Sequence, residues 1–483
     1  MESNKKILNN FLWRLLERTS AQGVVFVVSI ILARLLDPAV YGTVALVTVF
    51  TSLFRVFVDS GLGTALIQKK DADEEDFSTV FYFNLIMCAV LYGILFAIAP
   101  LISRFYGIPE LTAIVRVLSL TLIISGFSCI QNAVVSKKLL FKRFFFSTLG
   151  GTLVSAAVGI VMAYCGLGVW ALVGQTLTNN LANTLILWVT VKWRPKRCFS
   201  LSRLKGLFAY GWKILASSLL NTVYTDICSL FIGKLYSTEA LAFYNRGHQF
   251  PQIIVTNINS SIDSVLLPVM SAEQDNREQV KSMTRRAIKI SAYVMMPMMV
   301  GLAVCAEPFI RLLLTEKWLP AVFFLRIFCF TMAFYPIHTA NLNAIKATGR
   351  SDLFLKLEII KKVIGLIALL STIWISVEAM ACSLLFTTLL SSFINAFPNK
   401  KLLRYSYWEQ LLDMLPSVLL SLGMGAVVFC ISLLPLNDVV TLLIQIALGV
   451  LLYVGGSVLF RVESFTYILS VAKSYLKKGK QTH

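Results

Sequence analysis

Apolar stretches of about 20 residues recur along the whole chain, with a short polar segment between each and the next. A helix of this length crosses the hydrocarbon core of a bilayer with its backbone hydrogen bonds satisfied internally. Of the 483 residues, 57% are hydrophobic and 14% charged, and the mean hydropathy is +0.75. Soluble domains carry about 25% charged residues. The sequence therefore predicts an all-α polytopic membrane protein.

We expect about fourteen transmembrane helices from this pattern. They lie near residues 11–36, 40–67, 79–103, 111–136, 147–166, 168–191, 206–233, 241–270, 287–306, 320–345, 354–374, 377–398, 411–434 and 439–460. The fifth and sixth are separated only by a short break at residues 165–168, and the eighth carries Arg246, His248 and Asp263.

The basic residues predict how the helices are oriented. If the N-terminus is cytoplasmic, 32 of the 44 Lys and Arg residues fall in cytoplasmic segments and only five in the opposite loops. Cytoplasmic loops of membrane proteins carry this excess of positive charge. We therefore expect both termini to be cytoplasmic and most of the +19 net charge to reflect topology. Basic loops such as residues 192–205 then need no nucleic-acid partner.

Charged residues inside the proposed spans carry more functional information, because burying a charge in a membrane is costly unless it is paired or hydrated. Apart from residues counted above with the loops, the basic ones are Arg14, Arg18, Arg55, Arg116, Lys213, Arg246 and Arg326, and their acidic neighbours at membrane depth are Glu17, Asp59, Asp226 and Asp263. Positive charges exceed negative ones in this set, so the interior is expected to favour an anionic solute. Arg55 and Asp59 are spaced i,i+4, which predicts an ion pair within one helix.

Weak internal similarity suggests that the chain contains a repeat. Trp13-Arg14 parallels Trp212-Lys213, residues 34–40 parallel 234–240, and residues 115–120 parallel 325–330, all in the same order. The pattern predicts two six-helix lobes in parallel, at residues 1–200 and 201–405, followed by two extra helices and a cytoplasmic tail at 406–483. In transporters built from repeats, substrate binds where the repeats meet and access alternates between the two sides.

Three motifs resemble those of a known family. ARLLDPAVYG at 33–42 is followed by DSGLGTALIQK at 59–69 with acidic residues before Phe77, and YNRGHQFP lies at 244–251. These segments resemble bacterial polysaccharide flippases of the Wzx and teichuronic-acid types, within the multidrug/oligosaccharidyl-lipid/polysaccharide (MOP) superfamily. The resemblance implies that the chain moves an undecaprenyl-diphosphate-linked oligosaccharide across the bacterial plasma membrane. The lipid bilayer and the polysaccharide polymerase machinery are the other expected partners.

Such a cargo fits the charges in the spans, because guanidinium groups bind phosphate through directed hydrogen bonds. We expect Arg14, Arg18, Lys213 and Arg246 to attract the diphosphate. Arg55, Asp59, Asp226 and Asp263 are expected to serve ion coupling, to H⁺ or Na⁺, or charge pairing. For Arg14, Arg18 and Lys213, snorkelling to the membrane interface is the structural alternative.

Other functions are weaker alternatives. The sequence shows no catalytic or metal-binding constellation, since its nine cysteines and three histidines are scattered, so neither an enzyme nor a metal cofactor is predicted. A cation-coupled multidrug exporter of the same superfamily would favour an acidic cavity. A non-transporting scaffold of a polysaccharide assembly complex would have little reason to keep charges at membrane depth.

Overall fold

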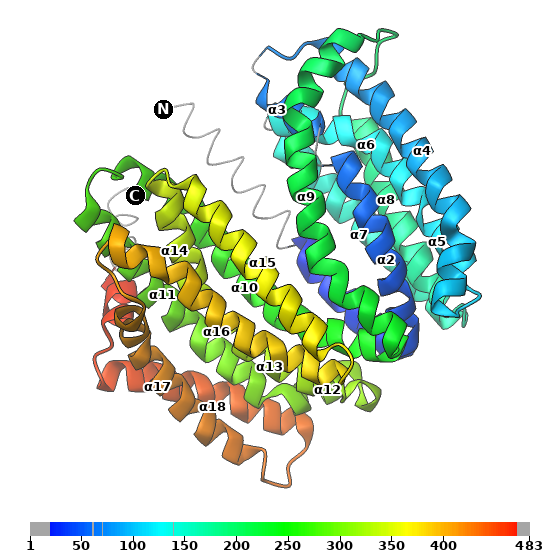
Figure 1. Cartoon of the computed structure of the whole chain (residues 1–483). Helices are drawn as coiled ribbons and strands as arrows, with labels where there is room; N and C mark the ends of the chain where they lie inside the picture. Colours follow the sequence, from blue (N-terminus) through cyan, green and yellow to red (C-terminus); the bar gives the residue numbers. More distant parts are fainter. Residues whose placement is uncertain (1–19, 60–61, 70, 139, 471–483) are drawn as a thin grey trace, which may run out of the picture. The chain divides into compact units, whose positions relative to one another are not determined.

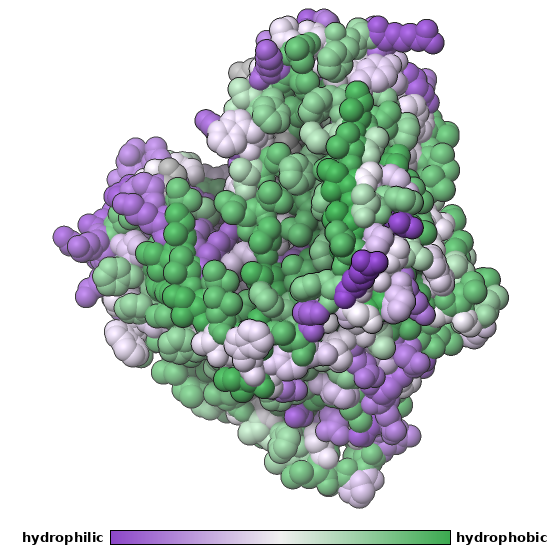
Figure 2. All heavy atoms as spheres, turned by 45° about the vertical axis from the view of Figure 1, so that its right-hand side comes forward, coloured by the Kyte–Doolittle hydropathy of each residue, from purple (hydrophilic) through white to green (hydrophobic). Residues whose placement is uncertain are grey.

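The computed structural model describes residues 20–59, 62–69, 71–138 and 140–470, which form helices and no strand (Figure 1). Within these ranges, ten helical segments are long and apolar enough to cross a membrane, and a shorter apolar helix covers Ser20–Leu35. Apolar side chains cover much of the face shown in Figure 2, as expected for a protein surrounded by lipid. The predicted all-α membrane class is confirmed.

The exact number of spans stays a prediction. The described part of every proposed span is largely helical, but the helices at the sixth, eighth and eleventh positions are not among those ten. The mean hydropathy of these three helices is lowered by side-chain amides in the sixth span, by charged residues in the eighth and by lysines in the eleventh. The break between the fifth and sixth spans is present, where Gly166 and Gly168 have φ of 75° and 51°. Glycine adopts such left-handed angles without steric cost.

By its internal contacts the chain divides into two compact units, residues 1–242 and 243–483. The predicted lobe boundaries at residues 200 and 405 stay predictions. In the first unit Ser20–Leu35 is followed by α2 (Pro38–Asp59), α3 (Leu62–Gln68), α4 (Glu74–Tyr106), α5 (Leu111–Leu118), α6 (Leu120–Lys137), α7 (Phe141–Tyr164), α8 (Val169–Thr190) and α9 (Leu201–Leu235). Helix α7 packs along α8, and α2 packs along α9.

The second unit contains nearly all of α10 (Thr238–Ala272). The elements that follow are α11 (Arg277–Val304), α12 (Ala306–Leu314), the short 3₁₀ helix η1 (Glu316–Trp318), α13 (Ala321–Ala333), α14 (Tyr335–Ala347), α15 (Ser351–Thr372), α16 (Val377–Leu402), α17 (Tyr407–Ile431) and α18 (Asp438–Leu459). The last two helices pack on α11, where the Tyr453 hydroxyl donates to the Tyr293 carbonyl at 2.7 Å and the Tyr293 hydroxyl bonds Ser457.

Two arginines give direct support to the internal repeat. Arg116 on α5 donates from Nε to the carbonyl oxygen of Phe96 on α4 at 3.4 Å, and Arg326 on α13 donates to that of Ala303 on α11 at 3.2 Å. Both arginines lie on the first of two short helices that replace one continuous span, α5–α6 and α13–α14. Equivalent residues thus make equivalent contacts in the two halves, so a shared structural role explains both charges.

Two glycines in the family-like motifs allow helices to approach closely. A Cβ at Gly42 would lie 1.7 Å from the carbonyl oxygen of Thr238, in the first turn of α10. A Cβ at Gly247 would lie 2.5 Å from the Cβ of Phe324 on α13. Separations this short cannot be accommodated without moving a helix. These motif positions therefore serve packing within each unit.

Candidate functional site

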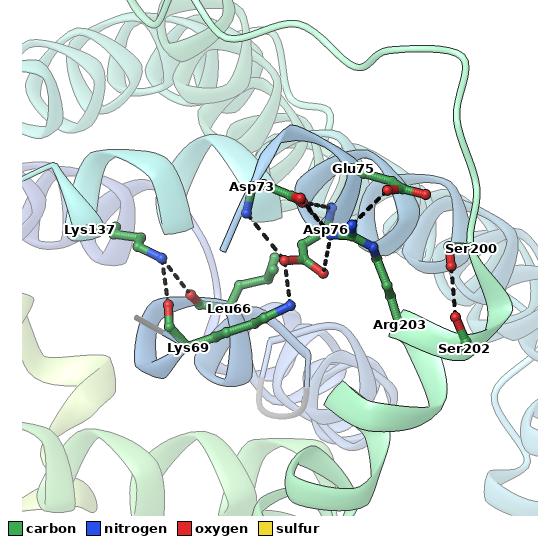
Figure 3. Close-up of polar contacts among 9 residues, drawn as sticks. All are labelled: Leu66, Lys69, Asp73, Glu75, Asp76, Lys137, Ser200, Ser202 and Arg203. Carbon is green, nitrogen blue, oxygen red and sulfur yellow. Dashed lines mark hydrogen bonds and ion pairs between the residues drawn. The ribbon is translucent and has the colours of Figure 1, made fainter. Parts of the chain in front are cut away.

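The acidic residues of the family-like motif form a cluster where α3, α4 and α9 begin or end (Figure 3). Asp76 is fully buried, and its carboxylate bonds the Lys69 ammonium at 2.6 Å. Asp73 caps α4 by accepting from the backbone N–H of Asp76, while Asp76 accepts in return from the backbone N–H of Asp73. A reciprocal capping box of this kind satisfies backbone donors that a helix N-terminus otherwise leaves unpaired.

Arg203, in the first turn of α9, joins this group from more than 100 residues away. Its guanidinium contacts Asp73 at 2.6 Å, Glu75 at 2.9 Å and Asp76 at 3.4 Å. The backbone N–H of Asp76 and the guanidinium of Arg203 lower the pKa of Asp73 to about 2. We call Lys69, Asp73, Glu75, Asp76 and Arg203 the Arg203 cluster. It fixes the start of α9 against the start of α4.

The segment that connects α8 to α9 is bound to α4 next to this cluster. The backbone N–H groups of Lys196 and Ser200 donate to the hydroxyls of Ser78 and Thr79 at 3.0 and 3.1 Å. The Trp193 indole donates to the Glu74 carboxylate at 3.1 Å. The basic loop at 192–205 is therefore an ordered part of the first unit, and its contacts are structural.

The four cations predicted to attract cargo have different surroundings. Arg14 and Arg18 lie outside the described residues. Lys213 is exposed on α9. Arg246 on α10 is buried, with 6% of its surface exposed; it donates to Gln249 Oε1 at 2.7 Å, and its guanidinium carbon lies 5.3 Å from the centre of the Trp318 ring. Arg246 is thus buried inside the protein, with its guanidinium oriented by its neighbours.

The acids predicted for coupling or charge pairing each have a defined partner. Arg55 and Asp59 form the predicted ion pair within α2 at 2.8 Å, with both side chains about half exposed. Asp226 on α9 accepts from the Ser52 hydroxyl at 2.7 Å, and Asp263 on α10 accepts from the Asn343 amide at 2.6 Å. A role in ion coupling stays a prediction. Among the described residues, no group of three His, Cys, Asp or Glu side chains is placed to hold a metal ion.

Sequence reasoning missed a polar cavity of about 260 Å³ in the first unit, between α7, α8 and the helix Ser20–Leu35. Two valines of that helix, Val25 and Val28, form its apolar wall. Its polar lining consists of Thr152, Ser155, Gln175, Thr176, Asn179 and Asn180. We call this space the amide cavity.

A signal for this cavity is present in the sequence. Gln175, Asn179 and Asn183 recur every four residues, so their amides share one face of α8. That face packs on glycines of α7, because a Cβ at Gly159 would lie 3.0 Å from the Cβ of Gln175 and one at Gly151 would lie 3.2 Å from that of Asn183. We call these three regularly spaced amides the amide ladder of α8. In a predicted membrane helix, such a row forms a polar surface that must be covered by protein or hydrated.

Comparison with known proteins agrees with this architecture. The model of the family described as "Polysaccharide biosynthesis protein" matches residues 31–323. The teichuronic acid biosynthesis protein TuaB of Bacillus subtilis is 27% identical over 63% of this chain and 63% of its own length. The lipopolysaccharide biosynthesis protein WzxC of Escherichia coli is 22% identical over 75% and 74%. The match to TuaB thus spans just under two thirds of that relative.

Solved structures show which fold this is. The lipid II flippase MurJ, in an inward closed conformation, aligns with a TM-score of 0.72 over 94% of this chain and 98% of its own, at 16% identity. An inward-facing MATE multidrug resistance transporter of the MOP superfamily aligns with a TM-score of 0.64 over 80% and 97%, at 15% identity. The chain has the fold of MOP transporters, and because the family model covers more than half of it, the chain belongs to the polysaccharide biosynthesis protein family.

Proposed function

We propose that this protein moves undecaprenyl-diphosphate-linked oligosaccharide repeat units from the inner to the outer leaflet of the bacterial plasma membrane for surface polysaccharide synthesis. One combination supports this most strongly: a member of the polysaccharide biosynthesis family has the fold of a flippase for a lipid-linked glycan. Its relatives are named for teichuronic acid, succinoglycan transport and lipopolysaccharide synthesis. The shared element of that chemistry is a sugar polymer assembled at a membrane.

The charges at membrane depth suit this cargo. Arg246 is buried, and Gln249 and the Trp318 ring hold its guanidinium in place, so its charge is oriented before a ligand arrives. A diphosphate accepts paired hydrogen bonds from such a group. In our proposal Arg14, Arg18 and Lys213 attract the diphosphate along with Arg246. Asp59, Asp226 or Asp263 responds to a coupling ion, H⁺ or Na⁺, or holds the arginines in place, while access alternates between the two membrane faces.

A cation-coupled drug exporter is the second candidate, because a MATE transporter shares the fold with a TM-score of 0.64. Cationic drugs are bound best by a cavity with excess negative charge. The predicted spans of this chain hold more basic than acidic residues, which favours the anionic lipid over the drug. The amide cavity, whose lining carries no formal charge, also offers a cationic drug no counter-ion.

The proposal is tested by deleting the gene in its host. We expect lipid-linked repeat units to accumulate on the cytoplasmic face and surface polysaccharide to disappear. Re-expression of the wild type should restore export, and Arg246→Ala should restore it poorly, as should Arg14→Ala. Normal polysaccharide export in the deletion strain, together with new drug sensitivity, would instead establish the exporter.

A further inference from the structure

We propose that the amide cavity between α7, α8 and Ser20–Leu35 binds the hydroxyl groups of a sugar ring in the cargo. This inference rests on the proposed function and assigns it a recognition site distinct from the cations expected to bind diphosphate. All of the residues concerned belong to the first unit.

The cavity lies deep in the predicted membrane. At about 1.5 Å of rise per residue, Gln175 is roughly 9 Å and Asn180 roughly 16 Å along the helix from Val169, where α8 begins. Thr152 and Ser155 lie near the middle of α7, which is one of the ten candidate spans. Lipid tails cannot hydrogen-bond to amides or hydroxyls, so polar groups at this depth must face protein or a hydrated space.

Helix packing accounts for only part of this polarity. The Asn179 amide nitrogen donates to the Ser155 hydroxyl at 3.1 Å, which ties α8 to α7. The Asn180 amide nitrogen and the Thr176 hydroxyl donate to backbone carbonyls one turn earlier in their own helix. Among the described residues, the Gln175 amide has no hydrogen-bonding partner, and the side-chain oxygens of Asn179 and Asn180 accept no hydrogen bond. Donors and acceptors therefore remain for a ligand.

The unused groups are held in place by the backbone. Gly159 has no Cβ, and this lets the stem of Gln175 approach α7 to a separation at which a Cβ would be only 3.0 Å away. The close packing of α7 along α8 leaves the stem of Gln175 less conformational freedom than it would have on an open surface. A preorganised amide gains more from each hydrogen bond to a ligand because less side-chain entropy is lost on binding.

Size and charge indicate the class of ligand. The lining includes amides, hydroxyls and two valines, with no charged side chain. Pockets for drug-sized molecules measure about 300–1,000 Å³, and this one, at about 260 Å³, suits a single small ring. A neutral polyhydroxyl ring offers donors and acceptors at its edge to the amides, and C–H groups on its face to the valines. A phosphate or a cation finds no counter-charge in this lining.

The test measures binding to the purified full-length protein with two probes. One is the repeat-unit lipid extracted from the deletion strain, and the other is undecaprenyl diphosphate, which has no sugar. We expect Gln175→Met to weaken binding of the repeat-unit lipid about tenfold, the effect of losing one or two hydrogen bonds, and to leave binding of the sugarless lipid unchanged. Asn180→Leu, on the same helix, should give the same pattern, so the inference does not depend on a single variant.

The matched control is Thr190→Val, which removes a hydroxyl that is on the same helix but outside the cavity, where it bonds the Ile186 carbonyl. It should bind both lipids like the wild type. If Gln175→Met and Asn180→Leu weaken binding of both lipids equally, or weaken binding of neither, the inference is wrong. The proposed flippase function is not affected by that result. If the wild type itself does not bind the repeat-unit lipid, the proposed function is wrong and the inference falls with it.

Discussion

The Arg203 cluster and the amide cavity are two polar arrangements in the first unit, and they are built in opposite ways. The cluster uses full charges that neutralise one another at helix ends, with Arg203 contacting three carboxylates. The cavity uses uncharged amides and hydroxyls in the middle of helices, and some of these groups have no partner in the described structure. Paired charges hold helices together here, whereas unpaired neutral groups remain available for a ligand.

If this contrast is correct, breaking the cluster should affect folding most. Asp76→Ala removes the buried carboxylate that pairs with Lys69 and Arg203, and losing a hydrogen bond to a charged group costs about 1.5–3 kcal/mol. We expect a large fall in the thermal midpoint of the purified protein and in its yield from membranes. Glu75→Ala, which removes a carboxylate that is 40% exposed, should cost less than about 1 kcal/mol. Equal losses for the two variants would refute the structural role of Asp76.

A change that crowds the cavity should affect binding more than folding. Gly159→Ala places a methyl group 3.0 Å from the Cβ of Gln175, and overpacking of this kind costs about 1–3 kcal/mol. We expect a moderate loss of thermal stability and weaker binding of the repeat-unit lipid. Gly93→Ala on α4 is the matched control, because its new methyl group would meet nothing within 4 Å. If Gly159→Ala binds the repeat-unit lipid as tightly as the wild type does, Gln175 does not take part in binding that lipid.

Acid should weaken the cluster and leave the cavity unaffected. The pKa of Asp73 is about 2 in the folded protein, below the ordinary value of 3.8, so its charge stabilises the fold fully above about pH 4. This contribution is lost as the pH falls from about 4 through 2. The thermal midpoint of the wild type should therefore drop over that window, and Asp73→Asn should show a smaller drop from a lower starting point. If the thermal midpoints of the wild type and Asp73→Asn fall by the same amount over this pH window, Asp73 is not the source of the acid sensitivity.

The smallest effect is expected at the exposed pair of α2. Arg55 and Asp59 are each about half exposed, and an i,i+4 pair contributes about 0.3–0.5 kcal/mol. A double-mutant cycle with Arg55→Gln and Asp59→Asn should give a coupling energy of this size in thermal stability. Transport should survive in the double variant if the pair is only structural. Loss of transport with unchanged stability would instead assign Asp59 to ion coupling.

The sequence predicts those features that depend on local periodicity. Hydropathy indicates the helical segments, the spacing of Arg55 and Asp59 predicts their ion pair, and the repeat places Arg116 and Arg326 in matching positions. These signals work because they involve neighbours on one helix or the order of helices along the chain.

The contacts made by Arg203 and Gln175 could not be predicted in this way. Arg203 finds Asp73 at a separation of 130 residues, and no local pattern indicates that pairing. The amide ladder of α8 is visible in the sequence, but its meaning depends on α7 presenting glycines beside it. Which polar groups remain unused is decided only when the helices are packed.

Reconstitution of the purified protein into liposomes tests the central claim most directly. Repeat-unit lipid from the deletion strain is placed in both leaflets, and the sugars exposed on the outside are oxidised with membrane-impermeant periodate. With the wild type we expect nearly all of the lipid to be oxidised over time, because the protein brings inner-leaflet lipid to the outside. Liposomes without protein should stop at about half. If the protein-containing liposomes also stop at half, with or without an H⁺ or Na⁺ gradient, the protein is not a flippase for this lipid.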